Sequence, residues 1–198
     1  MTTTRNFKPS LTKDELNELE AETYSGNICI VNTEEEAEAA CSHLMKQKIV
    51  GFDTETKPSF TKGETHNVAL MQISDSTNCY LFRLNQIGMP NCLAKFLKSK
   101  RVKKIGLSTK DDFRALAQIK NDLKPDNFIE LQNYVTTFGI EEKSLSKIYA
   151  IVFGKRISKG QRLSNWEAEE LSPKQQLYAA LDAYATRKIF IELEGIVE

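Results

Sequence analysis

The most informative segment of this chain is Lys48-Ile49-Val50-Gly51-Phe52-Asp53-Thr54-Glu55-Thr56. Its apolar, β-branched first half is typical of a strand that crosses a core. Side chains two residues apart on a strand share a face, so we expect Asp53 and Glu55 to point together. Adjacent carboxylates repel each other unless a cation lies between them, and Mg²⁺ or Mn²⁺ prefers such oxygen ligands. The motif favours a divalent-metal site, with an exposed acid pair neutralised by Lys or Arg as the alternative.

A helix with a clear beginning lies near the C-terminus. Ser172 suits the N-cap, Pro173 suits the first helical position, and Gln175 completes a capping box. Tyr178 and Asp182 lie four residues apart on that helix, so they share a face and can address one site. The alternative is a core phenol beside a surface acid.

Between these two motifs, residues 103–116 predict a strand that leads into a helix. Asp111 and Asp112 fall near the N-terminus of that helix, where functional groups of α/β folds often gather and negative charge is favoured. Acids in a first helical turn also stabilise a helix without any further role. Only the combination of the three motifs indicates one shared site.

The following segments, taken in order, form a specific set: Phe52–Thr56, Asn67–Ile73, Cys79–Phe82, Lys104–Gly106 with Asp112, Ser164–Trp166 and Leu177–Tyr184. This set resembles the DEDD superfamily of 3′-5′ exonucleases, which have a ribonuclease-H-like fold. The resemblance runs from Ile28 to Ile191 and is to the tyrosine branch, which includes RNase D and the Werner-syndrome-type exonuclease domain. The histidine branch would have its general base at position 177, which is Leu177 here.

The resemblance implies a single α/β domain, with a mixed sheet flanked by helices. It implies a metal-dependent 3′-5′ exonuclease in which Asp53, Glu55, Asp112 and Asp182 hold two divalent ions, Mg²⁺ or Mn²⁺. In such hydrolysis one ion lowers the pKa of a bound water and the other stabilises the leaving 3′ oxygen. Tyr178 would help to orient the attacking water.

Within the family pattern, the spacing from Gly106 and the following Phe113 favour Asp112 over Asp111 as the metal-binding acid. A phenol has an ordinary pKa near ~10, so Tyr178 is expected to orient water through a hydrogen bond rather than to act as a strong base.

The resemblance also bears on the substrate, the 3′ end of a nucleic acid. RNase D-like members act on RNA and Werner-type members on DNA. The segments Asn67–Leu70 and Leu163–Trp166 look more Werner-like, which favours DNA over RNA. Phe60 is a candidate for stacking on the terminal base, whereas Trp166 is expected to pack the loop before the last helix.

The remaining pattern alternates strands and helices. Strands are predicted over Ile28–Val31, Ile49–Glu55, Val68–Ser74, Cys79–Leu84, Lys104–Leu107 and Phe128–Leu131, and helices over Ser10–Leu16, from Thr33 through Met45, over Asn91–Lys100, from Lys110 and over Ser144–Phe153. The short gaps that join the second, third and fourth strands predict antiparallel neighbours.

Length and composition fit this interpretation. The 198 residues, of which 40% are hydrophobic, suffice for one α/β domain with a substantial core. We expect a partly helical N-terminal extension over residues 1–24, polar and loose over residues 1–9, and the exonuclease domain over residues 25–198. Neither a signal peptide nor a membrane-spanning stretch is indicated, which predicts a soluble, cytoplasmic protein.

Net charge, the distribution of basic residues, and the cysteines and histidines bear on which ligands the protein can bind. Twenty-seven basic residues balance 27 acidic ones, which argues against a broad nucleic-acid footprint. Basic residues still cluster over residues 95–110 and 155–162, either for local phosphate contacts or as solvated surface. The four cysteines form no Cys-x-x-Cys pair, so we expect them to be reduced residues of the core. His43 and His66 are expected to have no catalytic role.

Two other classes of function compete with an active exonuclease. The first is a catalytically inactive nucleic-acid-binding or scaffold module of the same fold, and retention of four mutually repelling acids with Tyr178 argues against it. The second is a phosphohydrolase of the haloacid-dehalogenase type. That class needs Asp at the position of Glu55, and it leaves Tyr178 and Asp182 without a role.

Overall fold

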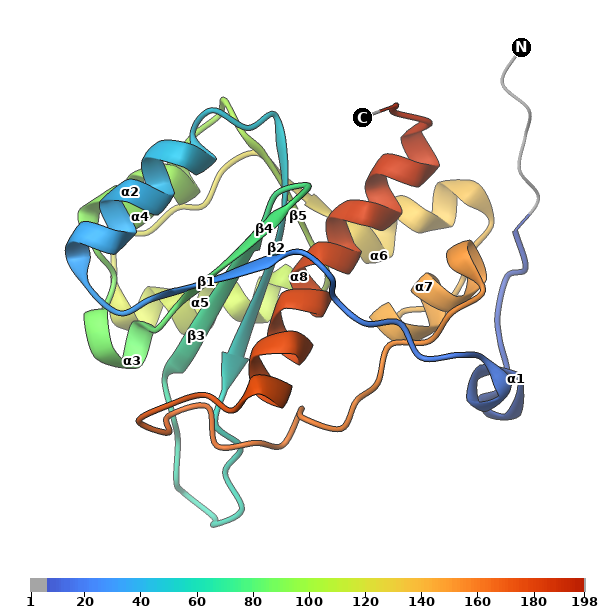
Figure 1. Ribbon diagram of the computed structural model, residues 1–198, viewed down its shortest axis with the longest axis horizontal. Coiled ribbons are helices and arrows are strands. Elements are labelled where there is room, and N and C mark those ends of the chain that lie inside the picture. The colour runs from blue at the N-terminus through green and yellow to red at the C-terminus, as the bar shows by residue number, and fades with distance from the viewer. Residues whose placement is uncertain (1–6, 198) are drawn as a thin grey trace.

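Six strands form one mixed sheet at the centre of the molecule (Figure 1). The structure is a computed structural model that describes residues 7–197. In spatial order the strands are β1 (Asn27–Val31), β4 (Asn78–Phe82), β3 (Val68–Ser74), β2 (Ile49–Thr56), β5 (Lys103–Gly106) and β6 (Phe128–Glu130). β3 runs antiparallel to both β2 and β4, and the pairs β1/β4, β2/β5 and β5/β6 are parallel. The predicted α/β fold with a mixed sheet is confirmed.

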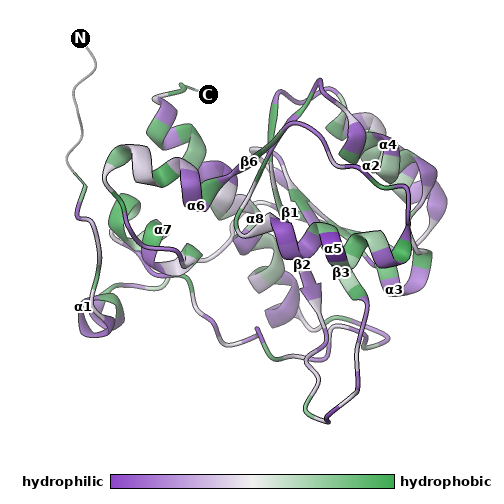
Figure 2. Ribbon diagram, turned by 180° about the vertical axis from the view of Figure 1, so that it is seen from behind, coloured by the Kyte–Doolittle hydropathy of each residue, from purple (hydrophilic) through white to green (hydrophobic). Residues whose placement is uncertain are grey.

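Helices cover both faces of this sheet. They are α1 (Lys13–Glu18), α2 (Glu34–Leu44), α3 (Leu84–Ile87), α4 (Asn91–Lys98), α5 (Thr109–Ile119), α6 (Leu131–Tyr134), the 3₁₀ helix η1 (Val135–Phe138), α7 (Leu145–Phe153) and α8 (Pro173–Glu194). In both ribbon views α2 and α4 lie on one side of the sheet and α6 and α7 on the other (Figures 1 and 2). One cluster of buried apolar residues accordingly includes side chains of α7 and α8, and a second includes those of α2, α4 and α5.

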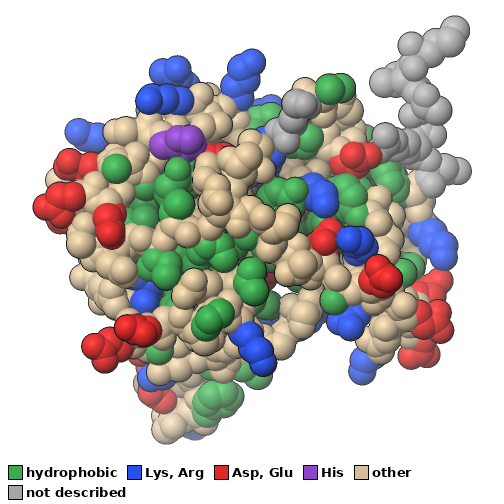
Figure 3. Space-filling view, viewed as in Figure 1, with side chains coloured by type: hydrophobic (Ala, Val, Ile, Leu, Met, Phe, Trp, Pro, Cys, Tyr) green, Lys and Arg blue, Asp and Glu red, His purple; other side chains and the backbone are tan. Residues whose placement is uncertain are grey.

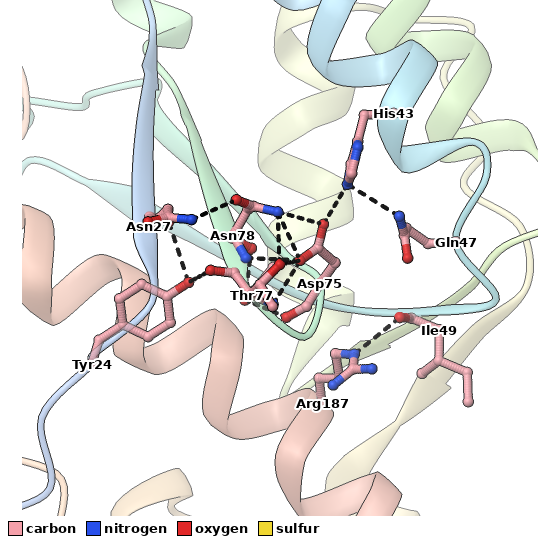
Figure 4. A network of polar contacts seen from close by, with 10 residues as sticks. Tyr24, Asn27, His43, Gln47, Ile49, Asp75, Thr77, Asn78 and Arg187 are labelled. Carbon is pink, nitrogen blue, oxygen red and sulfur yellow. Dashed lines mark hydrogen bonds and ion pairs between the residues drawn. The ribbon is translucent and has the colours of Figure 1, made fainter. Parts of the chain in front are cut away.

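The long helix α8 lies directly against β2, and a glycine makes this close approach possible. A Cβ on Gly51 would lie 1.8 Å from the carbonyl oxygen of Ala183, so no larger residue fits beneath the helix. Hydrogen bonds fix the same contact. Thr186 Oγ1 donates to the Ile105 carbonyl at 2.9 Å, and Arg187 Nε donates to the Ile49 carbonyl at 3.1 Å (Figure 4). The packing brings the N-terminal half of α8 over the acidic end of β2.

The beginning of α8 follows the sequence prediction. Ser172 is the N-cap, and its side chain and that of Gln175 form the reciprocal hydrogen bonds of a capping box, with Pro173 in the first turn. The helix ends at Gly195, whose φ of +66° is the left-handed conformation that glycine adopts without strain.

Several predicted ends are wrong by one to three residues, as follows: α1 begins at Lys13 rather than Ser10, β4 ends at Phe82 rather than Leu84, α4 ends at Lys98 rather than Lys100, β5 ends at Gly106 rather than Leu107 and β6 ends at Glu130 rather than Leu131. Local capping explains the first, because Thr12 and Glu15 form a capping box and α1 starts after it. Short helices explain two others, because Leu84 begins α3 and Leu131 begins α6. A helix of four residues is too short to show a periodic pattern.

The segment that precedes β1 packs on the rest of the domain. Residues 1–6 of the predicted loose region lie outside the described residues. Ala21 forms a parallel bridge with Arg156, Glu22 N donates to the Arg156 carbonyl at 2.8 Å, and the Tyr24 ring is buried in the core. Within residues 7–197, every helix is too short or too polar to cross a lipid bilayer.

Candidate active site

Three carboxyl groups meet where β2 passes under α8. Asp53 and Glu55 point from the same face of β2, as their alternation predicts, and Asp182 reaches them from α8. One oxygen from each of the three lies within 4.8 Å of the others. Glu55 and Asp182 are each only 8% exposed. Two segments 127 positions apart in the chain thereby form one compact acidic triad.

The fourth predicted acid, Asp112, lies beside this triad rather than within it. Thr54, between the two acids of β2, donates a hydrogen bond from Oγ1 to Asp112 Oδ1. Asp111 instead turns outward, where it is 80% exposed and pairs with Arg114 at 2.9 Å. Of the two adjacent acids, Asp112 is the one that the fold places next to β2.

Glu130 holds the beginning of α5 in place, a role that the sequence does not signal beyond an acid at the end of a short strand. Its carboxylate accepts hydrogen bonds from the backbone N–H of Ser108 and Thr109, both at 2.8 Å. Ser108 has a left-handed φ of +63°, a conformation that is unfavourable for serine without such support. These contacts fix the helical turn that carries Asp112.

Tyr178 sits one helical turn before Asp182, and the two side chains lie close enough for each to shift the pKa of the other. The Tyr178 ring lies 6.0 Å from the Trp166 ring, with 35° between their planes. Trp166 is fully buried in the core cluster under α8. It therefore packs the segment before the helix, as expected, and it also supports the phenol beside the acids.

Burial is the main reason that the pKa values of the site rise. Burial raises the pKa of Asp53 well above its usual range, and the nearby Asp182 and Glu55 raise it further. Burial and neighbouring acids raise the pKa of Glu55, burial raises the pKa of Asp182, and burial raises that of Asp112 to about 6. The pKa of Tyr178 is likewise raised by burial and then by the acids, so the phenol keeps its proton at neutral pH.

Exposed cations approach the triad from the loop that precedes Trp166. Arg162 lowers the pKa of Glu55, and Lys159 lowers the pKa of Asp182, both through charge attraction. These residues belong to the basic run noted in the sequence. Neither side chain is an ion-pair partner of the acids at contact distance, so both remain available near the site to a negatively charged group.

A cavity of about 220 Å³ opens beside Tyr178. Its walls come from three parts of the chain: residues 22–24, the loop residues Ser158, Gly160 and Gln161, and the first turns of α8, including Lys174 and Leu177. The predicted N-terminal extension thus contributes to the surroundings of the site.

Both histidines contact acidic side chains outside the triad. His43 Nε2 is 2.6 Å from Asp75 Oδ2, in a polar network at the β3–β4 turn (Figure 4). Asp75 Oδ1 there accepts hydrogen bonds from the backbone N–H of Thr77 and Asn78. His66 Nδ1 contacts Glu167 at 3.0 Å and joins the β2–β3 loop to the segment before α8. The four cysteines are free thiols.

The donor set of the triad fits a hard divalent cation. Asp53, Glu55 and Asp182 offer only carboxylate oxygens, which Mg²⁺ and Mn²⁺ prefer, and their mutual repulsion is relieved when a cation binds. Within residues 7–197 this is the group of acidic, histidine or cysteine side chains close enough together to hold a metal ion.

A ribonuclease-H-like sheet with buried acids between β2 and α8 defines a nuclease domain of the α/β class. Residues 28–198 match the sequence model of a family described as 3′-5′ exonuclease, and the chain belongs to this family. The predicted membership, the enzyme class and the exonuclease function are thereby confirmed at the level of the family.

Named relatives agree with this assignment. The mouse bifunctional 3′-5′ exonuclease/ATP-dependent helicase WRN is 34% identical over 155 residues, which are 75% of this chain. A 3′-5′ exonuclease of Drosophila melanogaster is 26% identical over 204 residues, covering 94% of this chain. The chain spans 11% of the length of the mouse protein and 58% of the length of the fly protein.

Solved structures support the fold. The Nibbler EXO domain of Aedes aegypti superposes with a TM-score of 0.79 at 23% identity, covering 88% of this chain and 92% of that one. RNase D of Escherichia coli superposes with a TM-score of 0.74 at 20% identity, covering 85% of this chain and 46% of that one.

Proposed function

We propose that this protein hydrolyses phosphodiester bonds at the 3′ end of nucleic acid, with DNA favoured over RNA, by a mechanism that uses two divalent metal ions. The observation that carries the proposal is the buried acidic triad, whose three oxygens lie within 4.8 Å of one another. Buried like charges at this separation are unfavourable unless a cation balances them. Residues 25–198 would form the catalytic domain, and residues 1–24 an extension to it.

Each site residue has a distinct part in this proposal. Asp53, Glu55 and Asp182 would hold the ions, and Asp112 would complete the set from α5. When bound, the ions supply an activated water and stabilise the charge on the leaving 3′ oxygen. Tyr178 retains its proton because its pKa is raised, so its hydroxyl can donate or accept a hydrogen bond that orients the water.

Cationic side chains near the triad, and exposed apolar side chains in the loops that follow β2 and precede α8, suit a single-stranded 3′ end. Lys159 and Arg162 lie close enough to influence the acids and can contact phosphates. Phe60 is 81% exposed and Leu163 is 61% exposed, an arrangement suited to stacking and packing against unpaired bases. The space-filling view shows further hydrophobic side chains over the middle of the face that α8 crosses, with charged groups mostly at its margins (Figure 3).

The preference for DNA rests on the sequence comparison. The chain is 34% identical over 155 residues to mouse WRN, whereas its likeness to Escherichia coli RNase D, described as an exoribonuclease, is one of fold at 20% identity. The Werner-type motifs Asn67–Leu70 and Leu163–Trp166 point the same way. A Trypanosoma brucei RNase D that superposes on this chain with a TM-score of 0.73 was solved in complex with the RNA U12, so RNA must be tested as a substrate in parallel.

The test is a time course on 5′-labelled DNA and RNA oligonucleotides, both single-stranded and with recessed 3′ ends, in Mn²⁺, Mg²⁺ or EDTA. We expect a metal-dependent ladder that shortens from the 3′ end, faster on DNA, and lost in Asp53→Asn and Asp182→Asn. Asp111→Asn is the matched control, because that acid is exposed and turned away from the site.

Intact substrates in every lane would favour the inactive binding module. In that case the wild-type chain should still retain labelled oligonucleotides in a filter-binding or mobility-shift assay. Faster cleavage of RNA would reverse the proposed sugar preference and leave the mechanism in place.

A further inference from the structure

Gln72 is a fully buried glutamine in the middle of β3, with 0% of its surface exposed. Its side-chain Oε1 and Nε2 are both buried without a hydrogen-bond partner. An amide that is buried with neither end paired destabilises a fold, because it gives up its hydrogen bonds to water. Such groups are uncommon in native proteins and call for a reason.

The pairing of β3 places Gln72 next to the candidate metal site. β2 and β3 are antiparallel, and Gln72 lies directly opposite Asp53 in their register. Directly opposite residues project from the same face, with their Cβ atoms about 5 Å apart. The side chain of Gln72 therefore lies on the face of the sheet that carries Asp53 and that α8 covers.

The other sheet neighbours of Gln72 on this face offer it no charged partner. Leu81 lies opposite on β4, and Leu70 is two positions back along β3. Ser74, two positions on, already donates from Oγ to the carbonyls of Asp75 and Asn78. Among these sheet neighbours, Asp53 is the one with a carboxylate acceptor to which the Gln72 amide can turn.

We propose that Gln72 is a positioning residue for Asp53: when a divalent ion is bound, the Gln72 Nε2–H donates a hydrogen bond to the Asp53 carboxylate and holds that carboxylate in the orientation that binds the ion, whereas in the metal-free protein the amide is unpaired. This inference rests on the proposed metal-dependent function. An amide suits the role because it supplies a donor without adding a charge, whereas a lysine at this position would compete with the metal as a counter-ion for the triad.

A supporting role behind a metal ligand predicts opposite effects on stability and on metal binding. Replacing Gln72 by Met keeps the length of the side chain and removes its polar atoms. The metal-free fold should become more stable, because a buried unpaired amide is lost. Metal affinity should fall, because loss of a hydrogen-bond partner behind a ligand typically weakens metal binding about 10- to 100-fold.

The experiment uses the full chain, with Gln72→Met and the matched control Leu70→Met, which alters an apolar side chain on the same face of the same strand. Three quantities are measured: the melting temperature in EDTA, Mn²⁺ binding by titration calorimetry, and the Mn²⁺ concentration for half-maximal cleavage. For Gln72→Met we expect a melting temperature about 2 to 4 °C higher and Mn²⁺ binding weakened about tenfold or more. Leu70→Met should bind Mn²⁺ like the wild type.

Two outcomes would overturn the inference. Unchanged Mn²⁺ binding in Gln72→Met would show that the amide does not act on Asp53. A lower melting temperature in EDTA would show that the amide stabilises the fold by itself. Failure of the proposed function has a different signature, because wild-type protein would then neither bind Mn²⁺ nor cleave any oligonucleotide.

Discussion

Replacing Asp182 by Asn should stabilise the metal-free protein while it removes the response to metal. The three oxygens of the triad lie within 4.8 Å of one another. At an effective dielectric constant of about 20, two ionised carboxylates at that separation repel by about 3.5 kcal/mol. Protonation is the alternative, and holding a carboxyl with an ordinary pKa near ~4 in its neutral form at pH 7 costs about 4 kcal/mol. Either route makes the metal-free site a source of instability.

Asn removes one charge from the triad and keeps the shape of the side chain and one oxygen that can accept from Tyr178. The gain is reduced by the lost attraction to Lys159, which lowers the pKa of Asp182 in the wild type. We expect about 2 to 3.5 kcal/mol of stabilisation in EDTA at pH 7.5, which corresponds to a melting temperature about 5 to 10 °C higher for a chain of this length.

The assay is thermal unfolding with and without millimolar Mn²⁺. Wild type should gain stability from Mn²⁺, because a ligand that binds only the folded state stabilises it by mass action, and Asp182→Asn should lose most of that increment. Asp111→Asn, at an 80% exposed position, should stay within about 0.5 kcal/mol of wild type. An Asp182→Asn variant that melts at or below the wild-type temperature in EDTA would refute the claim that the triad is strained.

Three further predictions concern pH, substrate binding and the support of α5. In EDTA the wild-type melting temperature should fall as pH rises from 5 to 9. Acids whose pKa is raised in the folded state, such as Asp112 at about 6, stabilise the folded state only while they are protonated. A melting temperature that does not change with pH would contradict this prediction. Phe60→Ala should raise KM for single-stranded oligonucleotides about 5-fold or more and leave kcat within about twofold of wild type, because a base would no longer stack on this 81% exposed ring. An unchanged KM in steady-state kinetics would exclude base stacking on Phe60. Glu130→Gln should lower the free energy of unfolding, measured in urea, by about 1 to 2 kcal/mol, because the charge-assisted hydrogen bonds to the N–H groups of Ser108 and Thr109 are lost. An unchanged unfolding midpoint would show that these hydrogen bonds do not stabilise the fold.

The parts of the site that depend on local periodicity could be predicted from the sequence. Alternation along β2 places Asp53 and Glu55 on one face, and the α-helical repeat places Tyr178 and Asp182 on another. The start of α8 could also be predicted from the sequence, because a capping box involves residues only three positions apart. These features need no knowledge of the remaining chain.

Other features depend on contacts between distant segments. The local sequence does not show which of Asp111 and Asp112 belongs to the site. The packing of α5 against β2 decides this, because it places Asp112 in hydrogen-bond contact with Thr54 and leaves Asp111 exposed to solvent. The role of Glu130 at the beginning of α5 has no local signature, because that helix begins 21 positions earlier in the chain.

Gln72 illustrates the same division. In the sequence it is a polar residue within an apolar strand, and its spacing says nothing of Asp53. The register between β2 and β3 places the two residues opposite each other, and α8 excludes water from the space between the helix and the sheet. The sequence by itself determined which side chains share a face of each strand or helix, since that follows from the period of the backbone. Only the tertiary structure decided which faces meet, because register and close approach, such as that of Gly51 to Ala183, are set by packing across the whole chain.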